Sequence, residues 1–327
     1  MKEQLIAEVQ QQMLPYLNNE QLCKLRAAME YCMHGMEIIT TDPGQEKEQP
    51  DAASAFIAAK RIEGCSEKTL TYYRKTIDSM VISIGKAPAQ ITTEDLRRYL
   101  TEYQVRRKSS RVTIDNIRRI LSTFFSWLED EDYIVKSPIR RIHKVKTAKI
   151  LKDTYTDEAL ELMRDNCGSC RDLAIIDLLA SSGMRVGEMV ALNRDDINFN
   201  ERECVVFGKG CKERLVYFDA RTKIHLQNYL DSRTDNNPAL FVTLRAPYNR
   251  LQIGGVESRL RELGYQLNLP KVHPHKFRRT LATSAIDKGM PIEQVQQLLG
   301  HQKIDTTMHY AMVKQQNVKL AHRKYIG

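Results

Sequence analysis

Residues 273–310 contain three short helical patterns that proline and glycine keep apart. The apolar spacing after Pro274 predicts one helix, and residues 291–299 predict a second helix that Gly300 ends. Asp305 is placed to cap a third helix. We therefore expect three short helices here, whose polar side chains can converge on one anion.

Four polar side chains belong to these helices: His275, Arg278, His301 and Tyr310. The first two lie three residues apart, so they project from one face of the first helix. A phosphodiester under attack needs its oxygens held by a guanidinium group, and histidine can move a proton near neutral pH. Tyrosine can be the nucleophile if neighbouring cations offset the roughly 4 kcal/mol that ionising a phenol costs at neutral pH. The set therefore indicates attack on a phosphodiester.

An arginine and a glutamate precede this stretch. Arg185 follows a glycine turn in the first turn of a predicted helix, and Glu188 lies three residues further on. The two can share a face, so the carboxylate can orient the guanidinium group. An arginine at a turn is otherwise usually just solvated.

Two β-rich runs, residues 203–207 and 214–218, predict a hairpin with a basic tip. Glycines on both sides of Lys209 favour a tight turn that can push its ammonium group into a groove. A lysine there can donate a proton to a leaving alkoxide, although a basic hairpin tip is otherwise commonly a plain phosphate contact. Lys209 is the preferred candidate and Lys212 the alternative.

Together these motifs resemble the signature of the tyrosine recombinase (phage integrase) family. The resemblance rests on His-x-x-Arg at 275–278, Leu-Leu-Gly-His at 298–301 and a tyrosine nine residues beyond that histidine. The stretch from Met184 to Leu192 is similar to the family's first arginine box, and Gly-Lys-Gly-x-Lys-x-Arg from Gly208 is similar to its catalytic-lysine hairpin. One His-x-x-Arg alone is unspecific, but several motifs in the right order within residues 51–327 are specific.

The resemblance implies that Tyr310 attacks a DNA phosphate, forms a 3′-phosphotyrosyl link and releases a 5′-hydroxyl. Arg185 and Arg278 would clamp the phosphate oxygens, which stabilises the transition state electrostatically. Because the bond energy stays in the covalent link, neither a metal nor a nucleotide is needed. Rejoining to another strand gives recombination, with four protomers around two duplexes. An accessory DNA-bending or directionality protein is a further expected partner.

The same resemblance implies supporting roles for the remaining candidates. His275 would be a general acid or base, His301 would bond the phosphate or place the nucleophile, and Lys209 would protonate the 5′-oxygen. Glu188 would support the neighbouring arginine.

Charge is distributed unevenly along the chain. The net charge of +9 and the pI near 9.1 indicate a protein that attracts polyanions. Residues 1–50 carry a net charge of −4, whereas residues 51–145 carry +6 and the remaining residues carry +7. DNA binding is therefore expected of the two later segments and not of the N-terminal extension.

The 327 residues leave room for two ordinary domains. Residues 1–38 show two helical patterns and residues 40–50 resemble a linker, so 1–50 predict an acidic helical extension with a linker. Residues 51–145 predict an all-helical domain, similar to the core DNA-binding (SAM-like) domain of the family. Residues 146–327 are expected to form the catalytic domain. The expected fold class is mainly α with a small β-sheet (α+β).

Local signals place the helices of the two later segments. In the first of them, helices are expected after Ser66, from a cap at Thr93 and over residues 117–128. In the second, helices are expected after Thr156, over residues 173–181 and over residues 256–267.

Basic residues in turns and connectors are candidate DNA contacts, because phosphate contacts dominate affinity for DNA. A solvated loop is nearly as good an interpretation for any one of them. The candidates are Arg106, Arg107, Lys108, Arg111, Arg140, Arg141, Lys144, Lys146, Lys212 and Arg214.

Seven cysteines in a chain of this length fit reduced thiols. Cys167-x-x-Cys170 is interpreted as a turn before a helix, because zinc or redox chemistry needs a second ligand pair or a thioredoxin-like context. No metal site is expected. His273 and His309 are expected to be structural or to face solvent. No apolar run approaches the ~20 residues of a membrane span, so we expect a cytoplasmic, nucleoid-associated protein.

Three classes of function stay open. The first is a strand-exchange enzyme, either an integrase/excisionase of a mobile element or a Xer-like chromosome-dimer resolvase. The second is a DNA topoisomerase with the same chemistry, and the third is a DNA-binding relative without catalysis. The extra N-terminal helices favour the mobile-element enzyme. The basic tail, residues 311–327, either docks into a neighbouring subunit or packs on its own domain.

Overall fold

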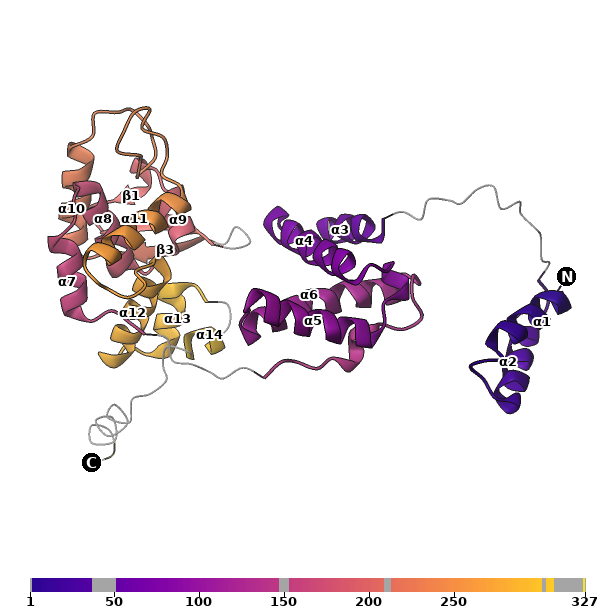
Figure 1. Cartoon of the computed structure of the whole chain (residues 1–327). Coiled ribbons are helices and arrows are strands. Elements are labelled where there is room, and N and C mark those ends of the chain that lie inside the picture. The colour runs from indigo at the N-terminus through magenta and orange to yellow at the C-terminus, as the bar shows by residue number, and fades with distance from the viewer. Residues whose placement is uncertain are drawn as a thin grey trace. The chain divides into compact units, whose positions relative to one another are not determined.

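The computed structural model describes residues 2–36, 51–146, 153–208, 213–301, 304–308 and 326. The chain divides into two compact units, residues 1–148 and 149–327, whose helices and strands are labelled in Figure 1. The first is helical, and the second combines helices with one three-stranded antiparallel sheet. The expected mainly α fold with a small sheet is confirmed. Across the described ranges, no helix has the length and apolar character that a bilayer span requires.

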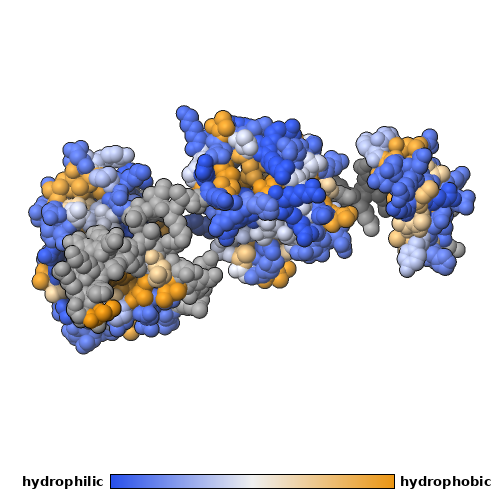
Figure 2. Space-filling view, turned by 90° about the horizontal axis from the view of Figure 1, so that it is seen from below, coloured by the Kyte–Doolittle hydropathy of each residue, from blue (hydrophilic) through white to orange (hydrophobic). Residues whose placement is uncertain are grey.

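The chain begins with a helical hairpin formed by α1 (Lys2–Met13) and α2 (Asn19–Cys32). Asn18 caps the second helix, and the two helical patterns expected in this extension are confirmed as two separate helices. Each helix buries one residue, Ile6 and Leu22 respectively. Other apolar side chains, among them Leu14, reach the surface of the hairpin (Figure 2). The predicted linker lies in 37–50, outside the described residues.

Four helices build the rest of the first unit: α3 (Ala52–Ile62), α4 (Glu67–Ile84), α5 (Thr93–Arg107) and α6 (Arg111–Asp130). Two 3-10 turns, η1 (Pro88–Gln90) and η2 (Pro138–Arg141), flank them. Phe56 of α3 packs against Phe124 of α6 in the core of this unit, with ring centroids 5.3 Å apart. Helix α3 was not anticipated from the sequence. The cap expected at Thr93 is wrong by one residue, because Thr92 forms the capping box with Asp95.

In the second unit, helices surround a small sheet. The helices are α7 (Asp157–Asp165), α8 (Cys170–Ser182), α9 (Val186–Ala191), α10 (Ala220–Asp231), α11 (Ile253–Gln266), α12 (Pro274–Asp287), α13 (Ile292–Leu299) and α14 (Ile304–Met308), with a 3-10 turn η3 (Arg194–Asp196). The strands β1 (Ile197–Asn198), β2 (Glu203–Phe207) and β3 (Glu213–Tyr217) pair in that order. The predicted hairpin is confirmed as β2–β3, with Val205 opposite Leu215. The short strand β1 and helix α10 were not anticipated.

Helix α8 is the centre of the second unit. It is buried on nearly all sides, together with its charged residues Arg171, Asp172 and Asp177, and it packs against both α10 and α12. Gly183 ends it, as predicted, and α9 begins three residues later. The core therefore holds the end of α8 close to the start of α12.

The C-terminal helices follow the expected order. Figure 1 shows α12, α13 and α14 grouped together, and Gly300 ends α13 with a left-handed backbone at φ 63°. The expected cap at Asp305 is wrong: α14 begins at Ile304, so Asp305 lies inside the helix, whereas an N-cap residue has a non-helical backbone. Tyr310 lies outside the described residues.

Candidate active site

Arg185 and Glu188 form a joined pair at the start of α9. Arg185 is the N-cap residue, and its backbone N–H donates to Oε2 of Glu188 at 2.7 Å. Its Nη1 donates to Oε1 of the same carboxylate at 2.8 Å. The side chain of Arg185 is 45% exposed, whereas that of Glu188 is 5% exposed. A buried carboxylate thus orients an open guanidinium group, which is the arrangement that their spacing predicts.

Arg214 binds the same carboxylate from strand β3. Its Nη2 donates to Oε2 of Glu188 at 2.8 Å, and its side chain is 12% exposed. Burial is the main cause that lowers the pKa of Arg214, and Glu188 opposes that change. Arg214 was expected to contact DNA, but its side chain is mostly buried against Glu188. The signal in the sequence is its register: Arg214 alternates with Val216 and Phe218, which are both buried.

Arg278 lies deeper than Arg185. Its side chain comes from α12 and the residue is 1% exposed. Nη1 donates to the carbonyl of Gly183 at 2.6 Å, and Nη2 donates to the carbonyl of Leu299. The guanidinium group therefore joins the ends of α8 and α13, where helix carbonyls lack partners within their own helix. His275, one turn earlier on α12, is exposed.

His301 follows the glycine that ends α13. Its Nδ1 lies 2.9 Å from Oγ1 of Thr307, and its backbone carbonyl accepts from Gln296 Nε2 at 2.9 Å. Burial and then four nearby basic side chains lower the pKa of this imidazole to about 4. These side chains, from the largest effect to the smallest, are Arg278, Arg185, His275 and Arg214. The ring is therefore neutral at pH 7 and can donate or accept hydrogen bonds there.

The second unit thus brings together residues from α9, β3, α12 and the segment after α13. Arg185, His275 and Arg278 all lie within electrostatic reach of His301, although the four residues span more than one hundred residues of sequence. Concentrated positive charge of this kind attracts a phosphate group. Lys209, Lys212 and Tyr310 lie outside the described residues, as does His309.

His273 has a structural position. It is the N-cap residue of α12, and its backbone N–H donates to Oη of Tyr155 at 3.0 Å. This bond ties the segment before α7 to the start of α12.

The other described candidate DNA contacts lie in the first unit. Arg106 and Arg107 end α5, Lys108 follows them, and Arg111 begins α6, so only Lys108–Ser110 separates the two helices. In the later connector, Ile142 and Val145 pack against the helical core, whereas the cationic side chains are exposed. The exposed ones are Arg140, Arg141, Lys144 and Lys146; Arg140 also pairs with Glu129 at 3.1 Å.

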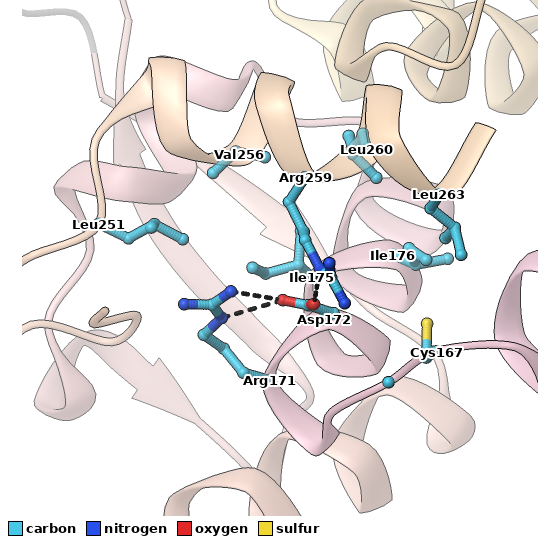
Figure 3. A pocket seen from close by; sticks show the side chains of 11 residues that line it. Cys167, Arg171, Asp172, Ile175, Ile176, Leu251, Val256, Arg259, Leu260 and Leu263 are labelled. Atoms are coloured by element: carbon cyan, nitrogen blue, oxygen red, sulfur yellow. Dashed lines mark hydrogen bonds and ion pairs between the residues drawn. The ribbon is translucent and has the colours of Figure 1, made fainter. Parts of the chain in front are cut away.

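The Cys167-x-x-Cys170 motif forms the turn before α8, as predicted. Figure 3 shows Cys167 among the residues that line a small pocket between α8 and α11, where Asp172 pairs with Arg171 and Arg259. Its volume of about 10 Å³ leaves room for at most one water molecule. Burial raises the pKa of Cys167 to about 12, so its thiol is unreactive near neutral pH. In the described part of the chain, no three His, Cys, Asp or Glu side chains are grouped as a metal site requires.

Two protein-family models match the chain. Residues 149–317 match the phage integrase family, and residues 53–134 match the N-terminal SAM-like domain of phage integrases. Tyrosine recombinase XerC of Oceanobacillus iheyensis is 31% identical over 289 residues, which cover 82% of this chain and 93% of that protein. Tyrosine recombinase XerC of Leptospira interrogans is 33% identical over 248 residues, which cover 72% and 78%.

Solved structures share the fold. XerH bound to a palindromic difH substrate superposes with a TM-score of 0.66 at 19% identity, covering 97% of this chain and 94% of that one. A lambda integrase dimer bound to a COC′ core site superposes with a TM-score of 0.67 at 20% identity, covering 79% and 93%. The family match spans more than half of the chain and contains the cationic cluster. The chain therefore belongs to the phage integrase family of tyrosine-type site-specific DNA recombinases.

Proposed function

We propose that Tyr310 is the nucleophile of this recombinase and that the cluster around His301 binds the scissile phosphate. The observation that carries the proposal is the convergence of two arginines and two histidines on one place in the second unit. The reaction forms an O–P bond from the phenol oxygen to the phosphorus and breaks the bond to the 5′-oxygen, which leaves as a hydroxyl after protonation. The reverse reaction with a different 5′-hydroxyl joins the exchanged strands.

The two arginines divide the work of holding the phosphate. Arg278 donates to two backbone carbonyls, so its guanidinium group is oriented before DNA binds. Arg185 is exposed and aimed by Glu188, so it meets the phosphate as DNA arrives. Two guanidinium groups fixed in this way stabilise negative charge that develops on the non-bridging oxygens.

The histidines and the lysine complete the proposed chemistry. His301 is neutral at pH 7 and serves as a hydrogen-bond partner of the phosphate or the phenol. His275 is exposed on the same helix as Arg278 and serves as general acid or base. Lys209 protonates the leaving oxygen, with Lys212 as the alternative.

The remaining parts of the proposal concern assembly and place. Residues 51–145 form the core DNA-binding domain, and residues 146–327 form the catalytic domain. Both domains bind the phosphates of one duplex. Four protomers around two duplexes, with an accessory directionality protein, carry out strand exchange in the cytoplasm at the nucleoid. The acidic helical extension, residues 1–50, favours an integrase of a mobile element; a Xer-like resolvase is the second candidate, favoured by the XerC relatives.

The decisive experiment is adduct formation on a nicked duplex that traps the covalent intermediate. The duplex is first selected from a random pool by binding to the protein. Tyr310→Phe should bind this duplex with unchanged affinity and form no protein–DNA adduct. Tyr265→Phe, which alters an exposed tyrosine of the same unit, is the matched control and should form adduct normally. Undiminished adduct in Tyr310→Phe would remove the nucleophile assignment.

Supercoiled plasmids separate the alternative activities. A recombinase exchanges strands between plasmids that carry the selected site and leaves plasmids without it supercoiled. Relaxation without a site, and no exchange with one, would indicate a topoisomerase. Binding without any adduct would indicate a catalytically inactive relative. Exchange between element ends and a chromosomal target, as opposed to resolution of two identical chromosomal sites, would identify the mobile-element enzyme.

A further inference from the structure

Arg214 occupies an unusual place in the site. It reaches Glu188 with a single described hydrogen bond, from Nη2 to Oε2 at 2.8 Å. The other oxygen of that carboxylate accepts from Nη1 of Arg185, also at 2.8 Å. One buried carboxylate therefore lies between an interior arginine and an exposed one. Arg214 and the exposed guanidinium group of Arg185 are therefore linked through Glu188.

Stability alone gives a poor account of this arginine. Among the residues that the structure describes, its buried Nε and Nη1 atoms have no hydrogen-bond partner. A buried N–H group without an acceptor destabilises the fold, and an apolar side chain of similar volume would avoid that cost. Glu188 already has two bonds from Arg185, so it does not need Arg214 as a counter-ion in order to be buried. An arginine kept under these conditions is best explained by a contribution to the reaction.

The backbone of the Leu-Leu-Gly-His motif is fitted to the same side chain. A Cβ atom on Gly300 would lie 2.5 Å from Cδ and 2.7 Å from Nε of Arg214, closer than atoms can approach. The arginine thus passes directly over Gly300, whose neighbour in the chain is His301. Arg214 therefore contacts Glu188, the partner of Arg185, on one side and Gly300, the neighbour of His301, on the other.

We propose that Arg214 is a positioning residue, which fixes Glu188 so that Arg185 points at the scissile phosphate in register with His301. The inference rests on the proposed function, because it assigns Arg185 to the phosphate. Without Arg214 the carboxylate gains rotational freedom, and the exposed guanidinium group of Arg185 samples several orientations. The pre-organised part of the clamp is then lost, whereas general attraction of DNA to the cationic surface stays.

The first test replaces Arg214 with methionine. Arg164→Met is the matched control, because Arg164 is also a mostly buried arginine, 14% exposed at its side chain, that binds a buried carboxylate, Asp177, away from the site. Cleavage of the nicked duplex is measured as a single-turnover rate at saturating protein, and duplex affinity by fluorescence anisotropy. Arg214→Met should cleave about 10- to 100-fold more slowly with nearly unchanged affinity. Its melting temperature should not fall, because the two buried nitrogen atoms without a described partner disappear. Arg164→Met should lose thermal stability and keep its cleavage rate.

Arg214→Lys separates positioning from direct contact with the phosphate. A lysine can reproduce one hydrogen bond to Glu188 but not the fork of an arginine. It should therefore recover most of the cleavage rate. A lysine variant as slow as Arg214→Met, with weakened duplex binding, would overturn the positioning role, because the fork would then be contacting DNA.

A double-variant cycle with Glu188→Gln tests whether Arg214 acts through Glu188. If Arg214 acts through Glu188, the variant with both changes should cleave at nearly the rate of the slower single variant. Independent, multiplying effects would overturn the inference, as would a wild-type rate in Arg214→Met. The proposed function fails on different results: adduct formed by Tyr310→Phe, or no adduct formed by the wild-type protein. If only the inference about Arg214 fails, the wild-type protein still forms the adduct and Tyr310→Phe still does not.

Discussion

Gly300→Ala is a sharp test of how the site is packed. Gly300 has a left-handed backbone, and its missing side chain leaves room for Arg214. Two effects therefore act together in the alanine variant. The backbone conformation disfavours any L-residue, and the new methyl group displaces an arginine of the site.

The structure gives the magnitude of the backbone strain and of the displacement of Arg214. The left-handed conformation costs an L-residue about 1–2 kcal/mol. The added carbon would lie 2.5 Å from Cδ of Arg214. Carbon atoms in favourable contact are at least about 3.5 Å apart, so the arginine must move by roughly 1 Å. A displacement of that size at a catalytic constellation can lower the rate by about 100-fold.

Gly289→Ala is the matched control within the same unit. Gly289 also has a positive φ, of 93°, but a Cβ atom there would meet nothing within 4 Å. Both variants should lose melting temperature, by roughly 2–4 °C for each kcal/mol of strain. Gly300→Ala alone should lose cleavage rate on the nicked duplex. Combining it with Arg214→Ala should remove the additional loss of stability, because the clash is then absent.

The reasoning would be refuted by equal behaviour of the two alanine variants. If Gly300→Ala cleaves as fast as Gly289→Ala, the contact with Arg214 does not set the geometry of the site. If the two lose the same stability, and Arg214→Ala changes neither, the packing of Arg214 over Gly300 has no energetic consequence.

Three further predictions follow from burial and from pKa values. Arg278→Lys should lower the free energy of unfolding by about 2–4 kcal/mol, because a buried guanidinium group loses bonds to two carbonyls. Arg185→Lys should cost under about 1 kcal/mol, since that side chain is 45% exposed; urea unfolding measures both. Because the pKa of His301 is lowered to about 4, its contribution to stability is present above its ordinary pKa of 6.5 and is lost as pH falls toward 4. His301→Asn should therefore lose less stability than wild type between pH 7 and pH 5, by up to about 2 kcal/mol; equal slopes would contradict the lowered pKa. Iodoacetamide at pH 8 should label exposed Cys170 well before Cys167, whose pKa is raised to about 12, as peptide mass spectrometry can follow; equal labelling of the two would contradict burial of that thiol.

The secondary structure of this chain was largely readable from local signals. Helical periodicity predicted α4, α6, α12 and α13, and glycines marked the ends of α8 and α13. Alternating β-rich runs predicted the β2–β3 hairpin. Capping positions were harder, because neighbouring threonines compete for the same role and only hydrogen bonding distinguishes Thr92 from Thr93.

The sequence by itself determined the chemical inventory: motif spacing predicted that Arg185 pairs with Glu188, and motif order identified the family. Only the tertiary structure decided the depth and the partners of each side chain. Arg278 is buried because two helix ends offer it carbonyls, whereas Arg185 stays open beside a buried carboxylate. Arg214 was expected among DNA contacts at the hairpin, yet it lies inside, over Gly300. Burial and hydrogen bonding depend on residues far apart in the chain, and a one-dimensional pattern contains no information on which of them meet.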